Sequence, residues 1–309
     1  MNTIESQKPE RGLVQIIFLS PTEPRLRAGW RLLLHTIVFL LLSLLAGIVI
    51  FIPIGILKIG FDSPIALLAN ELAMLIAITG STFLARRYLD KRSIVSLGLK
   101  PGKQAVQDIL AGITISFFQM GLIFGLEFAL GWTRIDGFAW QFDPGLTVLT
   151  GLGLWLIIFL VVGWQEELLS RGYQLQTIES GLNLFWAVLL SSSVFGILHI
   201  FNPGASWIST LGIILAGLFL ALPFILTRQL WLSIGLHIGW NFFEGVVFGF
   251  PVSGLDTYQL LRHTVSGPEL WTGGIFGPEA GLLVIPALLL GSLLLFAYVR
   301  SEIRKSDVG

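Results

Sequence analysis

The segment WQEELLSRGY, residues 164–173, places three charged side chains close together in a chain that is otherwise short of charge. On a helix, Glu167 and Arg171 stand one turn apart on the same face, where they can form an ion pair. Glu166 lies about 100° around the helix from Glu167 and stays outside that pair. The spacing therefore leaves one carboxylate, that of Glu166, available for chemistry.

Two of the four histidines follow in apolar segments, each one helical turn from a second notable side chain. His199 comes four residues after Phe195 in VFGILHIFNP, and His237 comes four residues before Asn241 in GLHIGWNFFEG. Ionisable groups inside lipid are costly, so several of them together indicate a functional site. We therefore predict a site that combines Glu166 with the two histidines and Asn241.

Side chains of these types can hydrolyse an acyl bond. A carboxylate and an imidazole on either side of a water molecule can take its proton, as a general base does. A second imidazole and a carboxamide can donate hydrogen bonds to the oxygen that becomes negative during attack on a carbonyl. Alternatively, Glu166, His199 and His237 could hold a divalent metal such as zinc, which lowers the pKa of its bound water. The residues alone leave both chemistries open.

The rest of the chain has the composition of a membrane protein. Of its 309 residues, 54% are hydrophobic and 12% are charged, and the mean hydropathy is +0.82. The formal net charge is zero and no long basic run is present, so no nucleic acid partner is expected. The chain has no cysteine, which excludes disulfides, thiolate metal sites and cysteine nucleophiles.

Eight stretches have the length of about 20 apolar residues that a helix needs to cross a bilayer. They are 32–57, 64–85, 109–131, 146–164, 182–200, 207–226, 230–249 and 280–299. With a cytoplasmic N-terminus, 16 of the 19 lysines and arginines fall on the inner side, which predicts that both termini are cytoplasmic. We expect an all-α, polytopic membrane helical bundle of about eight transmembrane helices, integral to the cell membrane.

The chain divides into a short tail and one large unit. Residues 1–24 are polar and contain three prolines, so we expect a loosely ordered cytoplasmic tail. Residues 25–309 are expected to form a single transmembrane domain. Within it, residues 250–280 are rich in glycine and proline and predict an ordered outer loop that packs over the bundle. The stretch GPELWTGGIFGPE in this loop has no evident chemical meaning.

With these motifs the chain resembles the CPBP family of intramembrane proteases, which comprises CAAX prenyl proteases, Abi proteins and bacteriocin-processing proteins. The family's motifs EExxxR, FxxxH and HxxxN stand here in that order and complete, over a core of about residues 146–249. The resemblance implies an intramembrane endopeptidase that acts on a membrane-anchored or lipidated peptide or protein in the bilayer. It also implies that Glu167 and Arg171 form a supporting ion pair. Family members related to the eukaryotic prenyl-protein endopeptidase cut the last three residues from prenylated CaaX proteins, and the family is often described as one of metalloproteases.

The resemblance assigns the remaining motif residues to the reaction. It implies that Glu166 and His199 activate the attacking water. His237 and Asn241 would stabilise the oxyanion of the tetrahedral intermediate. Whether a metal takes part is left open by the resemblance.

A shared site requires that these residues lie at the same depth in the membrane. The eight predicted spans place Glu166 at the inner end of the fourth and His199 at the outer end of the fifth. We therefore expect the fourth helix to continue through EELLSRGYQL and the fifth to end early or tilt. Glu71, Glu127 and Glu244, toward the outer ends of their spans, are weaker candidates for a functional role.

Two other classes of protein fit parts of the pattern. A membrane scaffold, for example an immunity or assembly factor, could retain the fold without catalysis. A transporter could use intramembrane Glu and His side chains to carry protons. The sequence shows none of the inverted repeats and broken paired helices that are typical of transporters.

Overall fold

The computed structural model describes residues 12–60 and 63–308, with side chains up to residue 302. Residues 1–11 of the expected tail lie outside this part of the chain. The described remainder of the tail is not irregular throughout, because α1 (Leu13–Phe18) is helical and Leu19 pairs with Leu26 in an isolated bridge.

Long apolar helices make up most of the protein, which confirms the predicted all-α fold class. Seven helices in the described part are long and apolar enough to cross a bilayer, so the chain is an integral, multi-pass membrane protein. On α2, side chains such as Leu40 and Leu44 are exposed, as helices that face lipid require. The helices begin and end as follows: α2 (Ala28–Ile56), α3 (Pro64–Leu84), α4 (Lys103–Ala129), α6 (Gly145–Glu167), α8 (Leu184–Leu198), α9 (Trp207–Thr227) and α12 (Val284–Val308).

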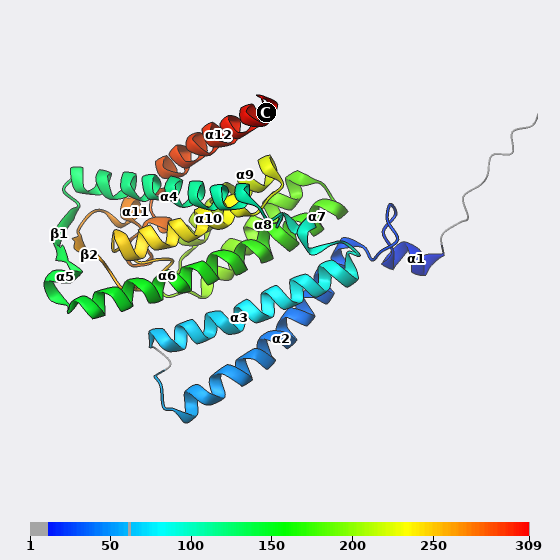
Figure 1. The fold of residues 1–309 in the computed structure, drawn as a ribbon, viewed down its shortest axis with the longest axis horizontal. Coiled ribbons are helices and arrows are strands. Elements are labelled where there is room, and N and C mark those ends of the chain that lie inside the picture. Colours follow the sequence, from blue (N-terminus) through cyan, green and yellow to red (C-terminus); the bar gives the residue numbers. More distant parts are fainter. Residues whose placement is uncertain (1–11, 61–62, 309) are drawn as a thin grey trace, which may run out of the picture.

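The expected span at residues 230–249 differs from the other seven. It consists of α10 (Trp231–Asn241), which has 11 residues, and the π-helical segment η5 (Phe242–Val247), which has six. All residues of α10 after Trp231 are buried, and the helix packs against α4, α6 and α9 in the middle of the bundle (Figure 1). It is shorter than a lipid-facing helix because its neighbours, and not the bilayer, surround it.

Glycines bring α4 and α10 unusually close together. A Cβ atom at Gly235 of α10 would lie 2.3 Å from the carbonyl oxygen of Ile109, and one at Gly112 of α4 would lie 2.5 Å from the backbone nitrogen of Leu236. Small residues at such crossings allow helix backbones to approach each other within a membrane. The contact fixes the central helix, which carries His237 and Asn241, against α4.

A small sheet closes one end of the bundle. Strand β1 (Thr133–Phe138) pairs antiparallel with β2 (Leu261–Val265), with an irregularity between Ile135 and Gly137. Short helical segments accompany it: α5 (Ala139–Phe142), α11 (Glu269–Thr272), η6 (Gly274–Phe276) and η7 (Pro278–Ala280). Neither strand was predicted. Figure 1 shows the sheet and α11 at the left-hand end of the bundle, with α1 and α7 (Gln176–Gly181) at the opposite end.

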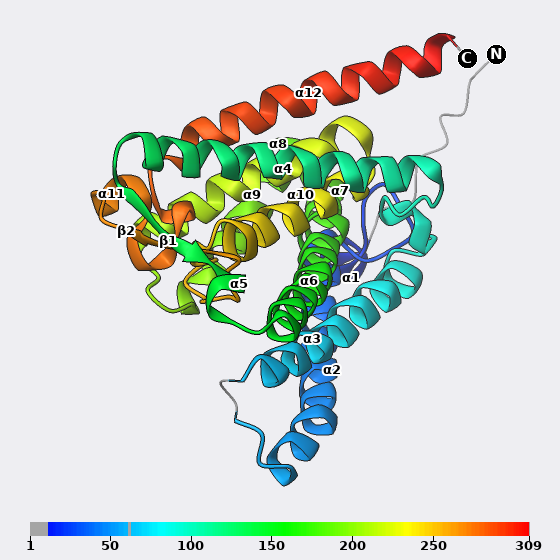
Figure 2. The same ribbon diagram turned by 60° about the vertical axis from the view of Figure 1, so that its left-hand side comes forward.

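The first two long helices form a hairpin at the side of the bundle. Figure 2 shows α2 and α3 projecting from the remaining helices, with α3 the inner of the two. In agreement with this view, α3 packs against α6. Short helical segments, η1 (Ala85–Leu89) and η2 (Ile94–Leu97), then connect α3 to α4.

Candidate active site

Glu166 and His199 lie at the same depth because α6 is only the first part of a longer helix. It continues through the π-helical segment η3 (Leu168–Leu175) and α7, giving one helical run of 37 residues from Gly145 to Gly181. The chain then turns, and α8 runs back alongside the same helix. Glu166 lies 16 residues before Leu182, and His199 lies 16 residues after Asn183. The fourth helix therefore continues and the fifth is short, as expected, and the apparent difference in depth disappears.

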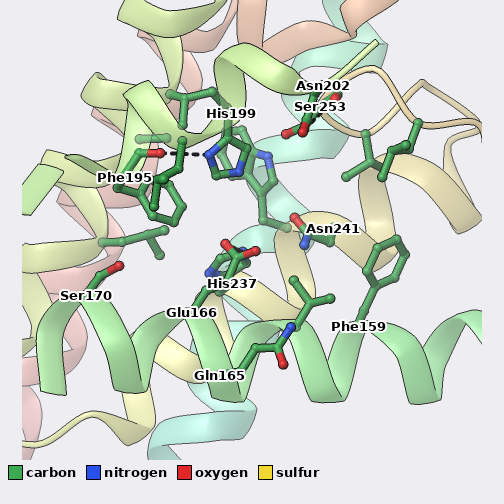
Figure 3. Close-up of a pocket in the computed structure, with 18 of the residues that line it drawn as sticks. Phe159, Gln165, Glu166, Ser170, Phe195, His199, Asn202, His237, Asn241 and Ser253 are labelled. Atoms are coloured by element: carbon green, nitrogen blue, oxygen red, sulfur yellow. Dashed lines mark hydrogen bonds and ion pairs between the residues drawn. The ribbon is translucent and has the colours of Figure 1, made fainter. Parts of the chain in front are cut away.

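A cavity of about 480 Å³ lies between these helices, and all four predicted site residues line it. Figure 3 shows Glu166 pointing from α6 toward His199, with His237 and Asn241 nearby on α10. The side chains of His237 and Asn241 are 6% and 7% exposed, whereas Glu166 keeps 29% of its side-chain surface exposed. Much of the remaining wall is apolar and includes Phe, Leu, Ile and Trp side chains. The cavity therefore brings together polar groups from three separate helices.

The ring of His199 is oriented by the backbone of its own helix. Its Nδ1 lies 2.8 Å from the carbonyl oxygen of Phe195, one turn earlier. Because a carbonyl oxygen can only accept, Nδ1 carries the proton in this bond. In the neutral ring, Nε2 is then the nitrogen with a lone pair, and it is the atom that can accept a proton from water.

The ring of His237 is held by the acidic residue that follows Glu166. Its Nδ1 donates to Oε1 of Glu167 at 2.8 Å, and the same oxygen accepts from Nη1 of Arg171 at 2.8 Å. Glu167 and Arg171 therefore form an ion pair, with side chains 0% and 1% exposed. Nε2 of His237 lies 3.7 Å from Oε2 of Glu166. Glu167 thus contacts the site directly and does not act only through the arginine.

Phe195 connects the three motifs. The guanidinium of Arg171 lies over its ring, 4.7 Å from the centroid, in a cation–π contact. The same ring meets His237 edge-on at 6.0 Å between centroids. Arg171 also donates to the carbonyl oxygen of Gly217 on α9 at 2.7 Å. A buried arginine thereby ties together the helices that carry Glu166, His199 and the neighbouring α9.

One of the comparisons with known proteins finds a match. Residues 148–243 match the family model of the type II CAAX prenyl endopeptidases, Rce1-like. The core of this chain is therefore Rce1-like. The match supports the interpretation of this chain as a membrane protease. No curated protein and no solved structure matches the chain.

The Rce1-like segment contains every motif residue but not the whole cavity wall. It includes most of α6, then η3, α7, α8, α9 and α10. The cavity also takes residues from α2 and α3 and from the outer loop after residue 250. These parts of the cavity wall lie outside the matched residues.

Several polar residues of the cavity were not predicted from the sequence. Gln165, next to Glu166, donates from Nε2 to Oε2 of Glu71 on α3 at 2.5 Å. Asn202, just after α8, donates to the carbonyl oxygen of Ser253 at 2.9 Å. The hydroxyl of Ser253 donates to Oε2 of Glu279 at 2.6 Å. Gln165 stood in the motif segment, but Ser253 and Glu279 come from the glycine-rich loop, where nothing in the sequence indicated a polar role.

The three residues expected to hold a metal, Glu166, His199 and His237, line the same cavity. Across residues 12–60 and 63–308, no group of three or more His, Asp or Glu side chains is arranged to hold a metal ion. His199 and His237 bond to Phe195 and Glu167 through Nδ1, which leaves Nε2 of each ring as the nitrogen that could bind a metal. Nε2 of His237 lies 3.7 Å from Oε2 of Glu166. A divalent metal, if bound, would be held by Glu166, His199 and His237 and would lower the pKa of its water.

Proposed function

We propose that the protein is an intramembrane endopeptidase that hydrolyses a peptide bond of a membrane-anchored or lipidated substrate. The observation that carries this proposal is the meeting of Glu166, His199, His237 and Asn241, from three helices, in one largely apolar cavity. An apolar wall suits a substrate segment that arrives from the lipid. The four polar groups that the proposed hydrolysis requires all lie in the Rce1-like segment.

In the proposed reaction, a water molecule lies between Glu166 and His199. The water donates hydrogen bonds to the carboxylate of Glu166 and to Nε2 of His199, one of these two groups takes one proton, and the water oxygen attacks the substrate carbonyl. The amide of Asn241 and the imidazolium of His237, which carries a proton on Nε2 as well as on the Nδ1 that bonds to Glu167, donate hydrogen bonds to the resulting oxyanion. The proton then passes to the leaving amine, which completes hydrolysis without any further reactant. Glu167 keeps His237 oriented during these steps.

The test is hydrolysis by purified protein in lipid. Candidate substrates include acylated peptides and prenylated peptides with a CaaX end. Replacing Glu166 by Gln, or His199 by Gln, should lower kcat by roughly 10²–10⁴-fold, the range for loss of a general base. Glu179→Gln is a matched control, because Glu179 pairs with Arg228 at an exposed site on α7, outside the cavity. Hydrolysis that persists unchanged in the Glu166 and His199 variants would reject the assignment.

The scaffold alternative predicts a different result. If the protein acts by binding alone, a cell that lacks it should recover its phenotype with the Glu166→Gln variant as fully as with the unaltered chain. Recovery only with the unaltered chain supports catalysis. The two results separate an enzyme from an immunity or assembly factor that keeps the same fold.

A further inference from the structure

The wall of the cavity carries acids but no fixed cation. Three carboxyl groups line it, those of Glu71, Glu166 and Glu279. Among its lining residues, all within the described part of the chain, there is no lysine or arginine. The adjacent Arg171 is 1% exposed and is committed to Glu167, Gly217 and the ring of Phe195. His199 and His237 are therefore the only groups in the wall that could present a positive charge to a ligand.

The glycine-rich loop holds Glu279 in the wall. Gly277 has φ of 105°, in the region that favours glycine, and a Cβ there would lie 2.1 Å from the carbonyl oxygen of Pro251. The carbonyl oxygen of Glu279 itself lies 1.8 Å from the position of a Cβ at Gly212 on α9. With its carboxylate bonded to Ser253, Glu279 is fixed at both backbone and side chain. The stretch GPELWTGGIFGPE thus delivers one buried acid to the cavity.

The other additional acid comes from α3. Glu71 accepts from Gln165 at 2.5 Å and from Asn70 at 3.2 Å, which fixes both of its oxygens. Glu71 is an electrostatic neighbour of Glu166, whereas Glu279 is a neighbour of His199 and His237. The two acids therefore flank the proposed reaction centre from different elements, and both lie outside the Rce1-like segment.

Two acceptors in the same wall have no partner among the described residues. Oε1 of Gln165, whose side chain is 3% exposed, accepts no hydrogen bond, and neither does Oε2 of Glu166. A buried acceptor without a donor is costly, so a water molecule or a ligand must supply the donor. The N–H groups of a peptide or an ammonium group would do so, whereas a carboxylate has no proton to give.

The substrate of a CaaX-type cut ends three residues after the scissile bond, so its free carboxylate lies about 10 Å away along an extended chain. In a cavity of about 480 Å³, that carboxylate would approach the acids of the wall. We propose that this site instead selects a peptide segment that is neutral or basic around the scissile bond and rejects a free C-terminal carboxylate. Glu279 is the specificity-determining residue. This inference rests on the proposed function, because it concerns the substrate of the same site.

Binding tests the inference separately from turnover. The His199→Ala variant, which keeps all three acids, is placed in nanodiscs of neutral lipid with acylated peptides that differ only in a C-terminal amide or carboxylate. The amide should bind on the order of tenfold more tightly, because a free carboxylate would lose its hydration in a wall that has acids and no lysine or arginine to compensate it. A peptide with lysine after the scissile position should bind at least as tightly as the amide. Equal binding of the pair, or tighter binding of the carboxylate, would overturn the inference.

A second substitution assigns the preference to Glu279. Adding Glu279→Gln, which keeps the shape and an acceptor for Ser253, should reduce the amide preference several-fold. Glu269→Gln is the matched control, because Glu269 belongs to the same loop but does not line the cavity. If the Glu279→Gln variant unfolds at the same temperature and still prefers the amide peptide to the same degree, Glu279 does not determine the specificity. Cleavage is measured with the unaltered protein and the same peptides. If the amide peptide binds more tightly but no peptide is cleaved, the proposed endopeptidase activity is rejected, while the proposed preference for a neutral or basic segment still holds.

Discussion

His237 and Arg171 donate to the same atom, Oε1 of Glu167, and each does so at 2.8 Å. One oxygen therefore orients an imidazole of the proposed site and neutralises a guanidinium that is buried between three helices. The second oxygen of Glu167 has no hydrogen-bond partner in the described part of the chain. Catalytic geometry and helix packing meet at this carboxylate.

Replacing Glu167 by Gln should lower kcat much more than it changes KM. The amide oxygen can accept from only one of the two donors as well as the carboxylate does, so the ring of His237 loses its fixed orientation. By analogy with loss of the acid that orients a catalytic histidine, we expect a fall in kcat of roughly 10²–10⁴-fold. Steady-state kinetics of the purified variant measure both constants. A change confined to KM would show that Glu167 affects substrate binding and not His237.

Removing the arginine should unfold the core more easily. Arg171→Met leaves Glu167 as a buried charge without its ion-pair partner, which costs about 3–5 kcal/mol. The double variant Glu167→Gln with Arg171→Met contains no uncompensated charge and should recover part of that loss. Thermal or denaturant unfolding in one detergent measures both. Losses that simply add in the double variant would mean that the two side chains do not interact.

Two glycines should respond oppositely to alanine. At Gly235 the added Cβ would lie 2.3 Å from the backbone oxygen of Ile109, so Gly235→Ala should destabilise the protein by roughly 1–3 kcal/mol through overpacking. At Gly125, also on a helix of this pair, no atom lies within 4 Å of the added Cβ. Gly125→Ala should therefore be neutral or stabilise by up to about 1 kcal/mol. Equal effects in unfolding experiments would contradict the close approach of α4 and α10.

The outer sheet should weaken in acid because of His263. Its ring lies between those of Phe124 and Phe250, 5.8 Å and 4.8 Å away between centroids, and burial lowers its pKa below the ordinary value of 6.5. The unfolded segment then binds a proton at a higher pH than the folded one. Stability present at neutral pH is consequently lost as pH falls below 6.5.

Hydrogen exchange tests this dependence. Protection factors of the β1 and β2 amides, corrected for intrinsic rates, should decrease between about pH 7.5 and about pH 5.5. His263→Phe removes the titrating group and keeps an aromatic ring between its neighbours, so the decrease should disappear. The same decrease in the variant would assign the effect to another residue.

Periodicity and composition predicted most of the bundle. Apolar length alone located α2, α3, α4, α9 and α12 to within a few residues at most ends, because lipid imposes one simple requirement on each of them. It did not predict that the seventh stretch is a short, enclosed helix, since burial by protein and burial by lipid select the same residue types. The strands β1 and β2 were missed because each is short and their pairing joins residues more than 120 positions apart.

The motif residues of the site could be found in the sequence, but their contacts could not. Spacing placed Glu167 beside Arg171, since both lie on one helix. It gave no indication that Glu167 also binds His237, which is 70 residues away. The role of Glu279 in the cavity wall could not be predicted from the sequence either. Its position depends on contacts with Gly212 and Ser253, which are distant in the sequence and meet only in the folded chain.

The turn at Leu182 and Asn183 lies midway between Glu166 and His199 along the chain, with a helical segment of equal length on each side. One residue inserted into either helical segment would shift Glu166 relative to His199 by about 1.5 Å along the helix axis. It would also rotate one of the two side chains by about 100° around its helix. An insertion or deletion of one residue between positions 166 and 199 should therefore abolish activity, whereas the outer loop should tolerate the same change. Only an equal change on the other side of the turn should restore the activity.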